Sequence, residues 1–375
     1  MTEERAEGNG SGKEDGRDHV KRNDTGQRND TGSDGGKRDK SGEDADKRSP
    51  GTSRDADGRT EAEFLAAYDV GDYERPSVAA DMVIFTVAGD KEANYRKLPK
   101  RSLRVLLIRR GGHPYLGSWA LPGGFVRPNE TADQAAAREL REETGVDRVY
   151  LEQLHTFSDV GRDPRTWVMS CAYMALVDSR GLDVRAGDDA DRAAWFELTY
   201  RLQGDSRERL GGGVVHTRRY ELRLTSVGAD SSEAEARRGN GPDGPESTDE
   251  ADVIELTALV ERRLTRTNGA SIDEYRIADN DGLAFDHAKM IAMAIERLRM
   301  RVERDELALH LMPERFTLTQ LQQVYEAILD RELLKAAFRR KAEPLVEKTD
   351  EYTEHAGHRP SRLYRRSREE WGDYR

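Results

Sequence analysis

GFVRPNETADQAAARELREETGV, residues 124–146, joins a glycine-containing turn to a segment that favours a helix. Within it, residues 131–144 have the Ala-, Glu- and Arg-rich composition of a helix. Thr131 and Gln134 form the residue pair expected of a capping box at the helix start. Gly145 stands where a residue in the left-handed conformation commonly ends a helix. The stretch therefore predicts a turn, a capped helix and a sharp stop.

Three glutamates of this predicted helix share one face. Glu139, Glu142 and Glu143 lie at positions i, i+3 and i+4, where their carboxylates repel one another unless a cation joins them. Arg138 precedes Glu142 by four residues and can orient it. Clustered oxygen donors suit Mg²⁺ or Mn²⁺, which keep positions open for phosphate oxygens and water. A solvated acidic helix face is the alternative interpretation of the three glutamates taken alone.

The spacing of the flanking residues decides between these two interpretations. The pattern has five unspecified residues before Glu130, seven before Arg138, and one before each of Glu142 and Gly145. Its specified residues are Gly124, Glu130, Arg138, Glu139, Leu140, Glu142, Glu143, Gly145 and Val146. Seven of the specified residues are glycine or charged, and each occurs by chance at roughly one position in fifteen. The expected number of chance matches over the whole chain is therefore on the order of 10⁻⁶. The spacing therefore favours a metal site over a solvated acidic helix face.

At these residues the sequence resembles the Nudix hydrolase family, whose signature it matches at every specified position. The resemblance implies the Nudix α/β/α sandwich and the cleavage of a nucleoside diphosphate linked to another moiety. The catalytic set that it implies is Arg138, Glu139, Glu142 and Glu143, with the three glutamates as ligands of Mg²⁺ or Mn²⁺. The substrate-binding set expected beside them is Gly123, Gly124 and Glu130.

A narrower resemblance covers about 300 residues, from Tyr73 onward. It is carried by YERPSV (73–78), SWALPGGFV (118–126), YLEQLHTFSDVGRDPR (150–165), LAFDH (283–287), MPERFTLTQLQQVYEAIL (312–329) and HRPSRLYR (358–365). These stretches resemble ADP-ribose-type Nudix proteins with a C-terminal winged helix. That group includes hydrolases and transcriptional regulators of NAD metabolism, some of which bind ADP-ribose without cleaving it. The resemblance implies ADP-ribose or a similar nucleoside diphosphate sugar as the ligand.

The chain around the signature predicts an α+β fold. Short β-rich apolar runs occur at 78–87, 103–108, 168–177 and 193–198. Strands thus flank the glycine turn and the helix, and Trp119, just before the turn, is expected to pack in the core or against a loop. A charged loop lies between two of these runs and contains Asp159, Arg162, Asp163 and Arg165. Arginine there can bind phosphate or stack on adenine, although an ordinary charged loop has the same composition. The resemblance favours binding and adds Arg162, Asp163 and Arg165 to the substrate-binding set.

Residues 199–280 predict an inserted β-hairpin. Apolar residues alternate with polar ones on both sides of the low-complexity segment 229–252, which we expect to form a disordered tip. A helix is predicted from His287 to Glu303, with Asp286 as its N-cap. His287 is expected to begin this helix in contact with solvent.

After the Nudix domain, the sequence predicts a winged-helix domain at residues 310–375. Two short helices at 317–329 and 333–341 precede a strand at 358–366. The second helix and the strand are basic, which fits a helix-turn-helix that docks on duplex DNA with a wing on the phosphates. The expected DNA contacts are Arg331, Lys335, Arg339, Arg340, Lys341, Arg362 and Arg365. A solvated basic face on an interaction module is the alternative.

Composition, net charge and cysteine count restrict the domain bounds and the possible functions. Residues 1–62 predict a disordered tail, because residues 1–60 contain no Ile, Leu, Phe, Trp or Tyr to bury, and the Nudix domain is expected at 63–309. The net charge of -11 argues against coating nucleic acid by bulk charge, so DNA binding would need a local basic patch. Cys171 is the single cysteine, so an intramolecular disulfide is excluded. No apolar run approaches the roughly 18 residues of a membrane span, so we expect a cytoplasmic protein without membrane contact.

The sequence favours a metal-dependent Nudix hydrolase that cleaves the pyrophosphate of ADP-ribose or a similar nucleoside diphosphate derivative. The alternative is an ADP-ribose-sensing, DNA-binding transcriptional regulator of NAD metabolism. A catalytically idle scaffold is a third interpretation. The leaving group, the operator sequence and the presence of a homodimer, which many relatives form, stay open.

Overall fold

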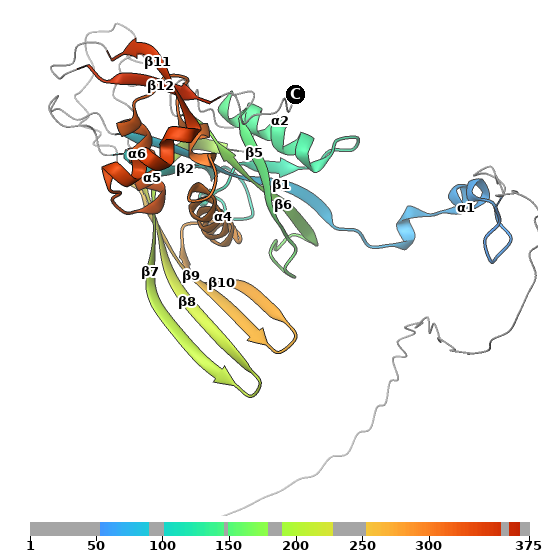
Figure 1. Cartoon of the computed structure of the whole chain (residues 1–375). Coiled ribbons are helices and arrows are strands. Elements are labelled where there is room, and N and C mark those ends of the chain that lie inside the picture. Colours follow the sequence, from blue (N-terminus) through green and yellow to red (C-terminus); the bar gives the residue numbers. More distant parts are fainter. Residues whose placement is uncertain are drawn as a thin grey trace, which may run out of the picture. The chain divides into compact units, whose positions relative to one another are not determined.

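The computed structural model describes residues 53–89, 101–145, 149–178, 190–227, 253–353 and 360–367 (Figure 1). The chain divides into two compact units, residues 1–72 and residues 73–375. Among the helices that the structure describes, none has the length and the apolar character needed to cross a membrane.

The first unit contains a short capped helix. Helix α1 (Glu61–Ala67) begins at a capping box in which Thr60 and Glu63 exchange hydrogen bonds, and the 3₁₀ helix η1 (Val70–Asp72) follows it. The disordered tail expected over 1–62 lies mostly outside the described residues. Its described part, 53–62, forms a turn and enters α1, so folded sequence begins before the expected boundary.

The second unit is built on one mixed sheet. Its strands are β1 (Ser77–Gly89), β2 (Arg101–Arg110), β3 (Trp119–Ala120), β4 (Gly123–Phe125), β5 (Tyr150–Phe157), β6 (Val168–Leu176), β7 (Ala190–Leu210), β8 (Gly213–Ser226), β9 (Glu255–Thr267) and β10 (Ser271–Asp281). The order is β10-β9-β8-β7-β2-β1-β6-β5, with β3 paired to β2 and β4 paired to β1. Strands β1 and β6 run parallel, and the other neighbours run antiparallel.

Helices cover both faces of this sheet because its central strands are apolar on both sides. Side chains alternate along a strand, so Met82 and Ile84 of β1 point to one face and Val83 and Phe85 to the other. Met82 and Ile84 pack in the same cluster as Leu140 of helix α2 (Ala132–Thr144). Val83 and Phe85 belong to the cluster that contains helix α4 (His287–Val302). The predicted α/β/α sandwich of an α+β fold is confirmed.

The inserted segment forms two hairpins rather than the single hairpin expected at 199–280. Strand β7 turns into β8 at Gly211 and Gly212, β9 turns into β10 at 268–270, and β8 pairs directly with β9 (Figure 1). The first part of β7 pairs with β2, so both hairpins extend the main sheet. The paired glycines mark a turn that the sequence interpretation passed over. The expected tip at 229–252 lies outside the described residues.

Helix α4 buries its apolar face as predicted, with Ile291, Ala294, Ile295 and Leu298 fully buried. A second anchor is polar. Glu296 accepts hydrogen bonds from the hydroxyls of Tyr200 and Tyr275, each at 2.9 Å, and pairs with Arg262. One carboxylate therefore ties three strands of the hairpins to α4.

The winged helix comprises η2 (Leu307–Leu311), α5 (Leu318–Leu329), α6 (Lys335–Ala342), η3 (Glu343–Leu345), β11 (Val346–Tyr352) and β12 (Arg362–Arg366). Both predicted helices and the predicted strand are present, with α6 starting two residues later than expected. Val324 and Phe338 of this domain lie in the same hydrophobic cluster as Leu298 and Val302 of α4. The winged helix therefore shares its core with the last helix of the Nudix domain.

Two buried tyrosines provide a matched test of this packing. Tyr200 donates to Glu296, whereas among the described residues no hydrogen-bond partner faces the buried hydroxyl of Tyr325. We expect Tyr200→Phe to lower the free energy of unfolding by about 1.5–3 kcal/mol, the usual range for a hydrogen bond to a charged group. Tyr325→Phe should leave it unchanged or raise it slightly, because an unpaired buried hydroxyl is removed. Urea unfolding of both variants checks this, and equal losses would contradict it.

Candidate functional site

The glycine turn makes room for the helix that follows it. A Cβ on Gly124 would overlap Oε1 of Glu139, so only glycine lets this carboxylate lie against the turn. Gly123 has a φ of +153°, and a Cβ there would overlap the carbonyl oxygen of Ala80. Because β4 pairs with β1, the turn is fixed to the sheet while it contacts α2. The backbone thus requires glycine at position 123, whereas Gly124 leaves the space that the Glu139 carboxylate occupies.

Arg138 contacts the carboxylates of Glu130, Glu139 and Glu142, and we call this group of four residues the Arg138 hub. The guanidinium of Arg138 donates to both oxygens of Glu130, at 2.8 and 3.2 Å, and to Oε1 of Glu139 at 2.5 Å. The same group lies 3.3 Å from Oε2 of Glu142 and donates to the carbonyl of Phe125 in the turn. One cation therefore offsets the repulsion between neighbouring glutamates and joins the helix to the turn.

These contacts shift the pKa values of Glu130 and Arg138. Hydrogen bonds from Arg138, followed by one from the backbone N–H of Arg127, lower the pKa of Glu130 to about 2. The pKa of Arg138 is raised in return, first by Glu130. Glu130 therefore stays ionised and keeps the Arg138 guanidinium oriented, while its expected part in substrate binding stays a prediction. The predicted cap is also present, since Thr131 and Gln134 form a capping box.

Two of the three predicted metal ligands present oxygens that a divalent ion could bind together with its ligand, and the metal site stays a prediction. The side chains of Glu139 and Glu142 are 12% and 50% exposed, and Glu143 is buried. In the part of the chain that the structure describes, no three acidic, histidine or cysteine side chains already surround one point. Mg²⁺ commonly takes one or two carboxylates and completes its shell with water and phosphate oxygens. Hard oxygen donors on one helix face, beside a turn cleared by Gly124, meet that requirement.

The charged loop between β5 and β6 is organised by two ion pairs. Arg162 donates to Asp286 at 2.7 and 3.1 Å, and its side chain is only 4% exposed. Arg162, predicted to bind substrate, is instead buried as a link between this loop and α4. Asp163 accepts from the backbone and the guanidinium of Arg165, whose side chain is 43% exposed. Of the two arginines, Arg165 is the one available to a ligand.

The start of α4 differs from the expectation in two ways. Asp286 occupies the predicted N-cap position but makes no side-chain cap, because its carboxylate binds Arg162. His287 is buried rather than exposed, and its Nδ1 accepts a hydrogen bond of 2.8 Å from the backbone N–H of Leu121. Burial lowers the pKa of His287, which keeps the imidazole neutral with its proton on Nε2. Trp119 packs on Phe196 in the core, as predicted.

Two aromatic residues of the site were missed by the sequence interpretation. The rings of Tyr115 and Phe285 lie 4.7 Å apart. The guanidinium of Arg165 lies over the ring of Phe285 and, at 5.3 Å, over the ring of Phe125. The only sequence signal for Phe285 was its place in the LAFDH stretch.

Six of the seven predicted DNA-binding cations of the winged helix are exposed, and the seventh, Arg365, is half-buried. Those exposed on α6 are Lys335, Arg339, Arg340 and Lys341. In the wing, Arg362 is exposed and donates to the hydroxyl of Tyr352, whereas Arg365 pairs with Glu347 at 2.7 Å. Of the predicted DNA contacts, Lys335, Arg339, Arg340 and Arg362 have no ion pair with a carboxylate within the described ranges.

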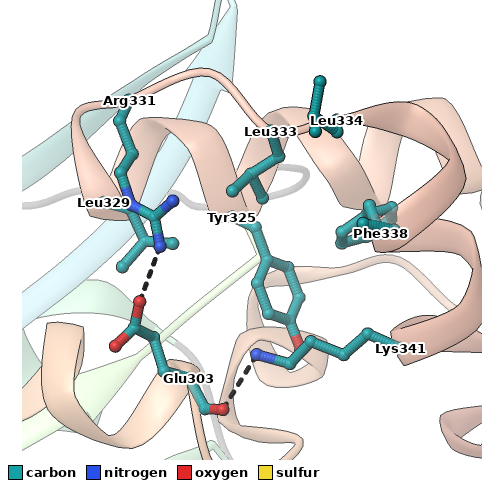
Figure 2. Close-up of a pocket in the computed structure, with 9 residues that line it drawn as sticks. Glu303, Tyr325, Leu329, Arg331, Leu333, Leu334, Phe338 and Lys341 are labelled. Carbon is teal, nitrogen blue, oxygen red and sulfur yellow. Dashed lines mark hydrogen bonds and ion pairs between the residues drawn. The ribbon is translucent and has the colours of Figure 1, made fainter.

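Two other predicted DNA contacts, both exposed, also bind the end of α4. Figure 2 shows Lys341 donating to the carbonyl of Glu303, at 2.9 Å, and Arg331 pairing with the carboxylate of Glu303 at 2.7 Å. Lys341 also donates to the carbonyl of Val302. These cations border a cavity of about 160 Å³ whose apolar side includes Leu333 (Figure 2). The contacts complete the end of α4, where cations are favoured by the exposed carbonyls.

Comparison with protein families matches both parts of the chain. Residues 98–207 match the NUDIX domain, and residues 308–366 match the NrtR DNA-binding winged helix domain. The crystal structure of a MutT/nudix family protein from Enterococcus faecalis is similar over 82% of this chain and 94% of that chain, with a TM-score of 0.52 and 29% identity.

Two curated relatives match different shares of this chain. The ADPR responsive transcriptional repressor NtrR of Acinetobacter baylyi is 29% identical over 310 residues, which are 82% of this chain and 88% of that protein. The ADP-ribose pyrophosphatase of Methanocaldococcus jannaschii is 36% identical over 126 residues, which are 34% of this chain and 64% of that protein. The similarity to the repressor is thus the more extensive of the two.

The Arg138 hub predicts a pH dependence. Because the pKa of Glu130 falls from 4.5 to about 2 on folding, its ionised form contributes stability that is present above about pH 4.5 and lost as the pH falls toward 2. We expect Glu130→Gln to lower the Tm at neutral pH and the difference from wild type to shrink in that acidic window. Thermal unfolding from neutral to acidic pH checks this, with exposed Glu208→Gln as control. A Tm difference that is constant over the range would contradict the hub.

Proposed function

We propose that this chain, which joins a Nudix domain to an NrtR-type winged helix, is an ADP-ribose-responsive transcriptional repressor. The sequence alone favoured a hydrolase, but the extensive similarity to a repressor gives the alternative better support. The observation that carries the proposal is that one helix, α4, contacts the candidate ligand site at its start and the winged helix at its end.

The start of α4 is built into the ligand site. Asp286 binds Arg162 of the charged loop, and His287 accepts from the backbone of Leu121, two residues before Gly123. Both contacts join segments that are far apart in the sequence. A ligand that moves the loop or the glycine turn therefore acts on α4.

The end of α4 is built into the helix-turn-helix. Arg299 donates to the carbonyl of Ile328 in the last turn of α5, at 2.9 Å, and to the carbonyl of Tyr200 in β7, at 3.0 Å. A cation at the C-terminus of a helix is favoured by its dipole. Lys341 of α6 in turn binds the carbonyl of Glu303 (Figure 2). Both helices of the helix-turn-helix are thus fixed to α4.

This connection supplies a physical route for regulation. Binding energies at two sites are coupled when both bias the same two-state element, and the coupling is reciprocal. In this chain the shared element is α4 with the winged helix attached to it. ADP-ribose would lower DNA affinity by favouring a position of α4 in which α6 and the wing no longer match the groove and its phosphates.

Local charge on an acidic chain supports the DNA-binding part. Lys335, Arg339 and Arg340 lie exposed on α6, and Arg362 lies exposed on the wing. Contacts to phosphate position a protein on DNA, and each one lost reduces the slope of log affinity against log salt by about 0.9. With a net charge of -11, such contacts must come from a local basic patch and not from the bulk charge of the chain.

We expect the protein to bind duplex fragments from promoter regions and ADP-ribose to weaken that binding by about 5- to 150-fold, the usual range of allosteric coupling. Fluorescence anisotropy titrations at about 50 mM salt, with and without saturating ADP-ribose, measure both effects. Unchanged DNA affinity in the presence of bound ADP-ribose would overturn the repressor proposal.

A matched pair of variants locates the DNA surface in the same titrations. Arg339→Ala with Arg340→Ala should reduce the salt slope by about two, because two phosphate contacts are lost. Arg207→Ala with Arg209→Ala removes the same charge from exposed positions of β7 and should leave the slope unchanged. Equal effects of the two pairs would assign binding to net charge instead of the winged helix.

Hydrolysis of ADP-ribose is a second candidate function, favoured by the complete carboxylate set. Glu139, Glu142 and Glu143 are the residues that would hold a divalent ion, and Arg138 orients two of them. A bound Mg²⁺ would neutralise diphosphate charge and lower the pKa of an attacking water. A protein that only senses its ligand has no need of every ligand of such an ion.

If the chain hydrolyses ADP-ribose, we expect Glu142→Gln to lower turnover by at least ~10²-fold, since it removes a charged metal ligand. The fold should survive because the Glu142 side chain is half exposed. AMP release over a Mg²⁺ titration measures this, with Glu208→Gln as the matched control. Wild-type rates in Glu142→Gln would remove this carboxylate from the site, and no AMP from the wild type would leave ligand sensing alone.

A further inference from the structure

A pocket of about 160 Å³ lies where the winged helix meets the end of α4 (Figure 2). Its lining comes from α5, from α6, from the segment between these helices and from Glu303, the C-cap of α4. Leu334 and Lys341, which are exposed, belong to this lining, so the pocket reaches the surface. None of the lining residues belongs to α2 or to the glycine turn. A cavity of about 150 Å³ takes up benzene, so this pocket has room for one small ring.

The walls of the pocket are apolar. Leu329 at the end of α5 lines one part of it, and Leu333 and Phe338 line another. Leu334 adds an apolar side chain that is 81% exposed. Because apolar surface is stabilised when it is removed from water, a nonpolar body that covers these side chains gains binding energy here.

One wall carries a hydroxyl that is unsatisfied within the part of the chain that the structure describes. Tyr325 lines the pocket and is 1% exposed, and its hydroxyl has no hydrogen-bond partner there. Figure 2 shows the hydroxyl end of Tyr325 directed toward the amine of Lys341, which lies 5.3 Å from the centre of the tyrosine ring. An unpaired buried donor costs free energy, which an acceptor on a ligand would recover.

A cation lies beside this hydroxyl. Lys341 donates to the backbone carbonyls of Val302 and Glu303, at 3.4 and 2.9 Å, and both partners are neutral groups. An ammonium has three donors, so one remains for a ligand. Partial burial lowers the pKa of Lys341, and an anion beside the amine would favour its charged form. Since Arg331 pairs with the carboxylate of Glu303, the charged residues that line the pocket leave it with a net positive charge.

We infer that this pocket binds a small aromatic carboxylate, with the ring against the apolar walls and the carboxylate at Tyr325 and Lys341. The hydroxyl and the ammonium both have a donor to offer, and an ionised carboxylate is a group that only accepts. Pockets for drug-sized ligands measure about 300–1,000 Å³, so a volume of about 160 Å³ suits a single ring and not a nucleotide. The inference therefore adds a second class of ligand to the ADP-ribose expected beside α2.

The position of the pocket connects such a ligand to the helix that carries the exposed cations. Ala337 and Phe338 of α6 line the pocket, whereas Lys335 and Arg339 lie on another face of the same helix. A ligand between α6 and Glu303 would contact both the winged helix and the end of α4. It would therefore strengthen the junction that Lys341 already makes.

Fluorine NMR titration of the full chain with para-fluorobenzoate tests this inference. The wild type should bind the probe, and unlabelled benzoate should displace it. Acetate lacks the ring and benzyl alcohol lacks the charge, so each should compete at least ~tenfold less effectively. Tyr325→Phe should weaken binding about tenfold, the loss of one hydrogen bond to a charged group, without lowering the urea unfolding midpoint.

Two substitutions on α6 form a matched pair in the same titration. Ala337→Leu should abolish binding, because the larger side chain fills the pocket that Ala337 lines. Ala336→Leu places the same side chain at an exposed position of α6 outside the lining, and it should bind the probe as the wild type does.

The outcomes separate the pocket from the proposed function. No binding to the wild type, or wild-type affinity in Ala337→Leu, would overturn the inference. Equal competition by acetate or by benzyl alcohol would overturn the assignment of an aromatic carboxylate. Complete displacement by ADP-ribose, together with wild-type affinity in Tyr325→Phe, would assign the probe to the site on α2 and overturn the pocket. Probe binding that depends on Tyr325 and Ala337 in a chain that binds neither DNA nor ADP-ribose would support the pocket and overturn only the proposed function.

Discussion

Helix α4 must satisfy a ligand site, a sheet and a winged helix at once, and the arrangement of residues 73–375 follows from that constraint. Its apolar face, including Ile291 and Leu298, is fully buried against the sheet, so the helix can change position only together with the elements packed on it. Its polar positions each bind a different element. Glu296 binds the hairpins, and Arg299 binds both β7 and the last turn of α5. A well-packed helix with partners on every side moves as one body, which suits transmission between two sites.

The carboxylate site is held in a similar way by one central cation. Arg138 engages Glu130, Glu139 and Glu142 and fixes them to the turn at Phe125. The oxygens that it binds are the donors that a divalent ion would need. Ion binding and the Arg138 hub therefore draw on the same groups, and their balance decides whether this Nudix domain chiefly holds its ligand or also cleaves it. Holding the ligand and cleaving it would both use the same carboxylates, which fits the similarity of this chain to a repressor and to a pyrophosphatase.

The accuracy of the sequence interpretation follows the range of the interactions involved. The capped helix over 131–144 was predictable because its caps and glutamate spacing are local, and the two-face pattern of the central strands is equally local. The partners of Arg162 and His287 were not predictable, because each contact joins residues more than a hundred positions apart. The ring contact between Tyr115 and Phe285 was missed for the same reason.

Charge composition misled the interpretation of the winged helix in a related way. Arg331 and Lys341 belong to a basic stretch, yet both bind the end of α4, whose position no local pattern reveals. Lys335, Arg339 and Arg340 share that stretch and remain exposed. The basic run therefore predicted a charged surface correctly, but not which of its members also bind the end of α4.

Amide hydrogen exchange of the full chain, without DNA, tests the role of α4 most directly. If α4 connects the two sites, ADP-ribose should alter exchange in the charged loop at 158–167, at the start of α4 and also in α5 and α6, residues 318–342. A response confined to the loop and the glycine turn, with 318–342 exchanging as in the free protein, would contradict the account. Ligand binding would then be separate from the winged helix, and regulation would need another route.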